Sequence, residues 1–319
     1  MPLIAAPTLL DSSTAMPASL VAQATELSVP VFVGPLIAAV LFAIGAAALK
    51  SSAKYRLGVW RTTFLCNVYI AVVYLPGLAF GTDSVPWHLW WQPPLVGLLY
   101  LTGQTSTVLA LTRGDVSVAG PVLAMKILIV AVLTTIVLQQ PIGASVWWAA
   151  LLATFGVALL NLGGRPEDRR RALFTAALAI LAASSFASFD ILLQRFAPAW
   201  GSFRFFSVML ISSAMMSLAF IPGFQGRWRD IPKAAWPSVA LGVGFLGTQS
   251  LVFGSTIALF GHATECNVVY ASRGLFSVLM VLALRQRLNN DEAKLPKLVM
   301  RARLFGASLM TFAIFLLLL

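Results

Sequence analysis

Two cations lie deep inside long apolar stretches of this sequence. Lys126 is about eleven residues from either end of Val116–Leu138, which corresponds to about 16 Å along a helix. Arg273 is nine residues into a second stretch, Thr264–Leu284. A lysine at the centre of a membrane helix costs about 2.5–3.5 kcal/mol, and from that depth its side chain does not easily reach the interface. Such a residue is kept where it faces a wet cavity or a partner, so both cations predict a buried binding site; the alternative for Lys126 is a bond to carbonyl groups or to a carboxylate.

Together the two cations predict a site for an anion. Two unneutralised positive charges near the middle of a membrane repel each other, and an anion bound between them relieves the repulsion. The arginine fork suits bidentate recognition of phosphate or carboxylate, whereas lysine acts as a point charge. Tyr270 precedes Arg273 by three residues and so shares its helix face. Gln104 and Gln249 supply neutral donors from neighbouring spans; for each glutamine the alternative is a hydrogen bond between helices.

Asp190 is the one carboxylate well inside an apolar stretch of the sequence. One interpretation is a proton-coupling acid, and the favoured one is a coupling or gating ion pair with Arg204, or with Arg195. Arg61 and Arg204 each begin a span, where a structural role at the interface is expected. Glu265 opens another span, where a carboxylate suits the helix dipole, and is an outside candidate.

The composition is that of an integral membrane protein. Of the 319 residues, 59% are hydrophobic and only 10% are charged, whereas soluble domains carry about 25% charged residues. The net charge of +11 comes from short clusters between apolar runs, which indicates topology signals rather than nucleic-acid binding. Two cysteines and two scattered histidines predict neither a disulfide framework nor a metal cluster.

Ten apolar runs are long enough to cross a hydrocarbon core about 30 Å thick. The sequence therefore predicts an all-α integral membrane protein with ten transmembrane helices. The expected spans are Pro30–Leu49, Val59–Phe80, Pro94–Leu111, Val116–Leu138, Ala144–Leu162, Ala172–Gln194, Ser202–Ile221, Trp236–Phe260, Thr264–Leu284 and Leu304–Leu319.

Lysine and arginine residues predict the orientation. Alternate loops hold seventeen of them, against Arg195 alone in the loops opposite. The positive-inside rule places the seventeen in the cytoplasm and both termini outside, in a multi-pass protein of the inner (plasma) membrane. Residues 1–29 contain no lysine or arginine, so we expect a retained polar or amphipathic tail rather than a secretory signal.

The chain also carries a weak internal repeat. ALTRGD (Ala110–Asp115) aligns with IALFGH (Ile257–His262), and the same register places Lys126 on Arg273. VWRTTF aligns with SFRFFS upstream, and TFGVALLNL with LFGASLMTF downstream, at offsets that drift only from 143 to 150. Five helices per half is an odd number, so the halves must be inverted in the membrane. The predicted units are the tail 1–29, a first repeat 30–163, a basic linker 164–171 and a second repeat 172–319.

These features resemble the drug/metabolite transporter superfamily in its ten-helix EamA-type form. The resemblance covers residues 30 to 319 and rests on the arginines that begin the second helix of each half, on the entry VSVAGPVLAM to the fourth helix and on the fifth helix FGVALLNLGG. It implies a transporter with a central cavity that works by alternating access. Organophosphate carriers of that superfamily hold phosphate with basic residues on the fourth and ninth helices, the positions of Lys126 and Arg273 here.

The leading hypothesis is therefore a secondary transporter for a small anionic metabolite, an organophosphate or a carboxylate. The sequence lacks a G-x-x-x-x-G-K-[ST] motif, so transport is expected to run on a proton gradient or on exchange, without a cofactor. The alternatives are an amino-acid or drug exporter of the same fold, a regulatory or lipid-handling membrane protein, and, remotely, an intramembrane enzyme acting on a lipid phosphate. The chain is expected to be no enzyme, to bind no nucleic acid and to be a monomer rather than an oligomer in the bilayer.

Overall fold

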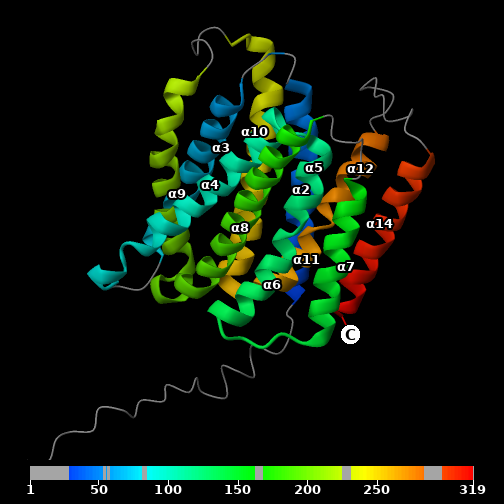
Figure 1. Ribbon diagram of the computed structural model, residues 1–319. Helices are drawn as coiled ribbons and strands as arrows, with labels where there is room; N and C mark the ends of the chain where they lie inside the picture. Colours follow the sequence, from blue (N-terminus) through cyan, green and yellow to red (C-terminus); the bar gives the residue numbers. More distant parts are fainter. Residues whose placement is uncertain are drawn as a thin grey trace, which may run out of the picture.

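The described part of the protein is a bundle of helices without strands (Figure 1). The computed structural model describes residues 29–52, 55, 58–80, 85–161, 168–224, 231–283 and 297–318. Residues 1–28 of the expected tail, residues 164–167 of the expected basic linker and residues 284–296, which hold three of the last six cations, lie outside these residues. The α-helices are α2 (Val29–Ser52), α3 (Val59–Tyr74), α4 (Gln92–Arg113), α5 (Val116–Ala124), α6 (Lys126–Val137), α7 (Ala144–Leu160), α8 (Arg169–Trp200), α9 (Ser202–Ser217), α10 (Trp236–Phe260), α11 (Ala263–Tyr270), α12 (Arg273–Ala283) and α14 (Lys297–Leu316).

The all-α membrane class and the expected helices are confirmed. Seven segments in the described ranges are long and apolar enough to span a membrane, and α7 is a shorter apolar helix. Short 3-10 turns extend α3 (Leu75–Ala79) and α9 (Leu218–Gly223). Both ends of the described chain lie at the same end of the bundle, which we call the α11 end because α11 begins there (Figure 1). The other end is called the α12 end.

The fourth and ninth expected spans are each broken, where the sequence predicted continuous helices. The first break is at Met125, whose N–H bonds back three residues to Val122, and the next helical residue is Lys126. The second break is at Ala271 and Ser272, directly before Arg273. Each mid-membrane cation is therefore the first residue of a half-helix.

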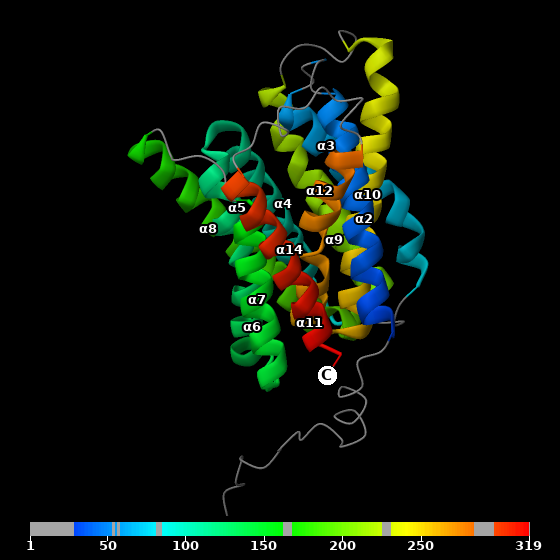
Figure 2. The same ribbon diagram turned by 90° about the vertical axis from the view of Figure 1, so that its right-hand side faces the viewer.

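Helices from the two halves of the chain interlock. The helix α10 packs along α2, and α4 packs along α8. The broken pair α5–α6 lies against α8, while α11–α12 lies against α2. From α5 to α6 the chain runs towards the α11 end, and from α11 to α12 it runs away from that end (Figures 1 and 2). This arrangement is what two inverted repeats would produce, and the repeat boundaries stay a prediction.

Two boundaries differ from those expected. The helix α8 begins at Arg169, so the last three residues assigned to the linker are helical. Asp168 starts this helix because its carboxylate accepts a hydrogen bond from the Arg170 N–H at 2.9 Å. At the other end α8 continues to Trp200, so Arg195 lies in a helix and not in a loop. Its guanidinium donates to the Val137 carbonyl at 3.0 Å.

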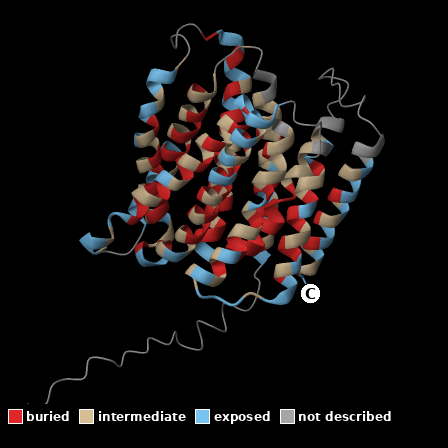
Figure 3. Ribbon diagram, in the orientation of Figure 1, coloured by how far each residue is buried: buried red, intermediate tan, exposed pale blue. Residues whose placement is uncertain are grey.

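Buried residues line the facing sides of the helices (Figure 3). Many large apolar side chains are exposed on the outside. Phe155, Leu173 and Phe312 are examples of exposed apolar side chains that suit contact with lipid. Small residues allow the closest approaches inside: a Cβ added at Gly156 of α7 would lie 2.7 Å from the Gly306 carbonyl oxygen of α14. Glycine at this crossing lets the two backbones pack directly.

Substitution of Gly156 tests this crossing. We expect Gly156→Ala to lower the free energy of unfolding by about 1–3 kcal/mol, because the new methyl group meets backbone that cannot yield easily. The matched control is Gly244→Ala in α10, where an added Cβ meets nothing within 4 Å. There the gain in helix propensity should leave stability unchanged or slightly raised. Thermal unfolding in detergent measures both, and equal melting temperatures for the two variants would contradict the packing account.

Candidate functional site

Lys126 and Asp190 form an ion pair in the middle of the bundle. The Lys126 Nζ lies 2.8 Å from the Asp190 Oδ2, and the aspartate is fully buried. The lysine comes from the start of α6 and the aspartate from α8, so the pair joins the two halves of the chain. A buried charge is tolerated when an opposite charge and hydrogen bonds satisfy it. The alternative interpretation of Lys126, a bond to a carboxylate, is thus the one that the structure displays.

The expected pairing of Asp190 with Arg204 or Arg195 is wrong. Besides Lys126, the Asp190 Oδ2 accepts a hydrogen bond from Asn267 Nδ2 at 2.7 Å, while its Oδ1 has no hydrogen-bond partner. Arg204 lies in the first turn of α9 and is no ion-pair partner of Asp190 within the described residues. The helix α8 turns Asp190 towards α6 and α11, and not along the hairpin towards α9.

Aromatic rings surround the lysine. Its Nζ lies 5.5 Å from the centroid of the Phe186 ring and 5.3 Å from that of Phe253. Phe253 in turn packs on Tyr270, with 4.4 Å between the ring centroids. Ring faces attract a cation, most strongly where water is excluded. These contacts fix the ammonium group beside Asp190 and separate it from lipid.

Arg273 lies among aromatic rings without a carboxylate. Its guanidinium carbon is 4.5 Å from the centroid of Tyr270 and 5.0 Å from that of Phe42. Within the described ranges no acidic group lies within ion-pair distance of it. Stacking leaves the edge of a guanidinium group, which carries its N–H donors, available for an anion.

The repeat register explains why the two cations have different partners. Asp190 and Phe42 are 148 residues apart, within the range of offsets that relates the two halves. Phe42 of α2 therefore occupies the position relative to Arg273 that Asp190 of α8 occupies relative to Lys126. One position carries a carboxylate and the other a ring. Lys126 therefore has a carboxylate in contact, whereas Asp190 acts on Arg273 only from a longer distance.

The expected ligands Tyr270 and Gln249 lie in one hydrogen-bonded chain. The Tyr270 hydroxyl donates to the Gln249 Oε1 at 2.6 Å, and the Gln249 Nε2 donates to Ser250 Oγ at 2.7 Å. The Tyr100 hydroxyl reaches the same Ser250 Oγ at 3.4 Å. This chain holds the Tyr270 ring in place beneath Arg273.

Gln104 and Arg61 lie in other surroundings. Gln104 accepts a hydrogen bond from Asn67 Nδ2 at 2.8 Å, and Asn67 accepts one from Ser213, which connects α4 with α3 and α9. Arg61 is buried, with its guanidinium carbon 5.8 Å from the centroid of Phe224. Neither residue contacts the Lys126–Asp190 pair, and the role of Gln104 as a donor to substrate stays a prediction.

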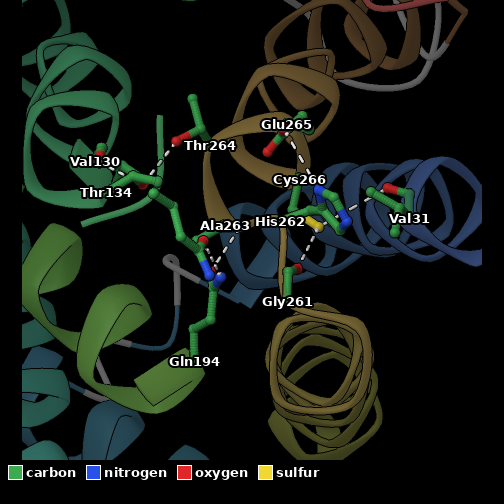
Figure 4. Close-up of polar contacts among 11 residues, drawn as sticks. Val31, Val130, Thr134, Gln194, Gly261, His262, Ala263, Thr264, Glu265 and Cys266 are labelled. Carbon is green, nitrogen blue, oxygen red and sulfur yellow. Dashed lines mark hydrogen bonds and ion pairs between the residues drawn. The ribbon is translucent and has the colours of Figure 1, made fainter. Parts of the chain in front are cut away.

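Polar contacts also gather where α11 begins (Figure 4). The Gln194 Oε1 accepts a hydrogen bond from the Ala263 N–H at 3.0 Å, and the Thr134 and Thr264 hydroxyls lie 2.9 Å apart. His262 Nδ1 is 3.5 Å from Glu265 Oε1. Glu265, the outside candidate of the sequence, thus lies at the end of the bundle and not in the central pair.

The sequence interpretation missed Asn267, Phe42 and Phe253. Asn267 had a usable signal, because Asn267, Tyr270 and Arg273 follow one another at intervals of three and so share one side of the ninth span. For Phe42 and Phe253 the sequence offered no such signal. Among the 21 phenylalanines of the chain, nothing in the sequence distinguishes a ring that packs on a cation from one that faces lipid.

Double substitution tests the ion pair. Lys126→Met should lower the free energy of unfolding by about 3–5 kcal/mol, because it leaves Asp190 buried without its counter-charge. The combination of Lys126→Met with Asp190→Leu should recover most of that loss, since both charges are removed together. Thermal or denaturant unfolding of the four proteins of the cycle measures the coupling. Additive losses would show that the two side chains do not interact.

The His262–Glu265 contact predicts a dependence of stability on pH. The hydrogen bond to Glu265 raises the pKa of His262 above its ordinary value of 6.5. A group whose pKa is higher in the folded state stabilises the fold fully below its unfolded pKa and loses that contribution as pH rises through the folded value. The melting temperature of the wild type should therefore exceed that of His262→Gln most at about pH 5.5 and least at about pH 8.5.

The matched control for this titration is Glu265→Gln, which removes the other partner. In a Glu265→Gln background, the further substitution His262→Gln should change the melting temperature less between about pH 5.5 and about pH 8.5 than it does in the wild type. A gap between the wild type and His262→Gln that stays constant with pH would contradict the assignment.

Comparison with known proteins gives a family match over part of the chain and a fold. Residues 30–162 match the EamA-like transporter family. No curated protein gives a match. Among solved structures, 27 chains match. One crystal structure, described simply as that of a protein, aligns with a TM-score of 0.65 over 90% of this chain and 95% of its own, at 18% identity. At that identity the likeness shows the fold alone.

Proposed function

We propose that this chain, whose residues 30–162 match the EamA-like transporter family, is a secondary carrier for a small anionic metabolite. The family is one of membrane transporters, in agreement with the multi-pass helical fold. The proposal adds the substrate class, a carboxylate or an organophosphate, and a route by alternating access through the centre of the bundle. Exchange for a counter-substrate or coupling to protons would drive it.

The observation that carries the proposal is that Arg273 has no carboxylate in contact with it among the described residues. Lys126 and Asp190 cancel at 2.8 Å, so the central cluster has one net positive charge, at a guanidinium group that stacks on Tyr270 and Phe42. An uncompensated charge inside a membrane is expensive, and a bound anion would reduce that cost. One net charge favours a monoanion over a dianion. The sequence, by contrast, predicted a site with two free cations.

A second candidate is a zwitterionic amino acid. The Asp190 Oδ1 is buried and has no hydrogen-bond partner, so it would accept a hydrogen bond from an ammonium group. In this arrangement Arg273 would bind the carboxylate of the same molecule. Both candidates give the same role to Arg273 and differ in whether Asp190 contacts the substrate.

Counterflow in proteoliposomes tests the proposal. The substrates are lactate, succinate, glycerol phosphate and a neutral amino acid, each radiolabelled, so that charge and chemistry vary separately. We expect exchange of a monoanion or of the amino acid. Arg273→Gln should reduce that exchange by about 30-fold or more, equivalent to about 2 kcal/mol of lost charge-assisted binding.

The matched control is Arg169→Gln, which removes an exposed arginine from the first turn of α8, about 30 Å along the helix from Asp190. It should transport like the wild type. Asp190→Asn separates the two candidates, because it should impair exchange of the amino acid more than exchange of lactate. Normal transport by folded Arg273→Gln would rule out the proposed anion site.

A further inference from the structure

Gln194 lies one helical turn beyond Asp190 on the same face of α8. Each of the two side chains touches both broken spans. Asp190 contacts Lys126 of α6 and Asn267 of α11. Gln194 accepts from the Ala263 N–H of α11 and donates to Gln140, just beyond the end of α6, at 3.2 Å. The helix α8 therefore holds α6 and α11 at two levels, once at the central site and once at the α11 end.

The contact with Ala263 is a helix cap supplied from another helix. The first N–H groups of a helix have no partner within it, and a preceding Ser, Thr, Asp or Asn usually supplies one. Here the preceding residue is His262, in the left-handed conformation at φ 56°, and its side chain makes no capping hydrogen bond. The amide oxygen of Gln194 satisfies the first N–H of α11 instead, so α11 cannot move away from α8 without losing its cap.

Neighbouring contacts seal the same end. The hydroxyls of Thr134 and Thr264 join α6 directly to α11 at 2.9 Å, in the view of Figure 4. All eight residues of α11 are buried, Cys266 completely so. In α12, by contrast, none of the side chains that the structure describes is buried. The ninth span is thus enclosed in its α11 half, whereas the described side chains of its α12 half are less buried.

We propose that Gln194 is the positioning residue of a gate: it fastens the start of α11 and the end of α6 to α8 and so closes the α11 end below the central site. The inference rests on the proposed function, because a gate has meaning only in a carrier that opens alternately at its two ends. Its test requires no substrate. A negative result in the counterflow assay and a negative result for the gate are therefore distinguishable.

The chain contains its own reporter of opening. It has two cysteines, and Cys266 lies buried within α11, with its Sγ 3.8 Å from the Val31 carbonyl oxygen of α2. In a Cys66→Ser background Cys266 is the one remaining thiol. The full chain is placed in nanodiscs, where both ends of the bundle meet solvent, and the rate of alkylation by N-ethylmaleimide is measured.

We expect Gln194→Ala to raise the rate of Cys266 alkylation about five- to tenfold, the range for loss of one helix cap. Gln194→Glu should restore the slow rate, because a carboxylate still accepts from Ala263 and the Gln140 amide can reverse to donate to it. The matched control is Gln92→Ala, which removes a buried glutamine at the same end that accepts from the Trp200 indole at 3.1 Å. It should alkylate at the rate of the background protein.

Two further variants keep the test decisive if Gln194→Ala does not fold. Gln140→Ala removes an exposed partner, and Thr134→Val removes a hydroxyl with little change of shape; each should raise the rate by a smaller factor. Melting temperatures are measured in parallel, so that general loosening is recognised. Rates equal to the background in the folded variants, or an equal rise in Gln92→Ala, would overturn the gate.

Discussion

The contact between Lys126 and Asp190 lies where helices from both halves of the chain meet. A lysine at the start of the half-helix α6 could not remain in the membrane without a counter-charge, and Asp190 of α8 supplies one at 2.8 Å. Through Asn267 the same carboxylate also reaches α11. The positions of both broken spans therefore depend on one buried carboxylate, and a change at this point reaches α6, α8 and α11 together.

In the proposed function the pair also sets the charge that a substrate would meet. It neutralises one of the two central positive charges. Arg273 keeps the other, because the position that matches Asp190 in the first half of the chain holds Phe42, which contacts Arg273 with its ring. Two halves of similar fold thus differ at matching positions, and the difference gives the site its charge. Along α8 the same face continues to Gln194, so the elements that carry the site are also those that close the α11 end.

Much of the fold followed from hydropathy, because apolar runs of about 20 residues have few alternatives to membrane helices. The breaks before Lys126 and Arg273 could not be predicted from hydropathy, because a local change of hydrogen bonding leaves the apolar pattern of the sequence intact. For the site, depth in the membrane identified Lys126, Arg273 and Asp190 individually. It could not pair them, because the partner of Asp190 depends on which way α8 faces, and that is set by packing between the two halves.

The most direct test of this account is the affinity of the double variant Lys126→Met/Asp190→Leu for the monoanion that the wild type exchanges fastest. Isothermal titration calorimetry in nanodiscs gives its Kd. If Lys126 and Asp190 compensate each other and Arg273 binds the anion, the double variant should bind within a few-fold of the wild type. A loss of binding as large as that of Arg273→Gln, in a protein that remains folded, would show that Lys126 is itself a ligand and would contradict the account.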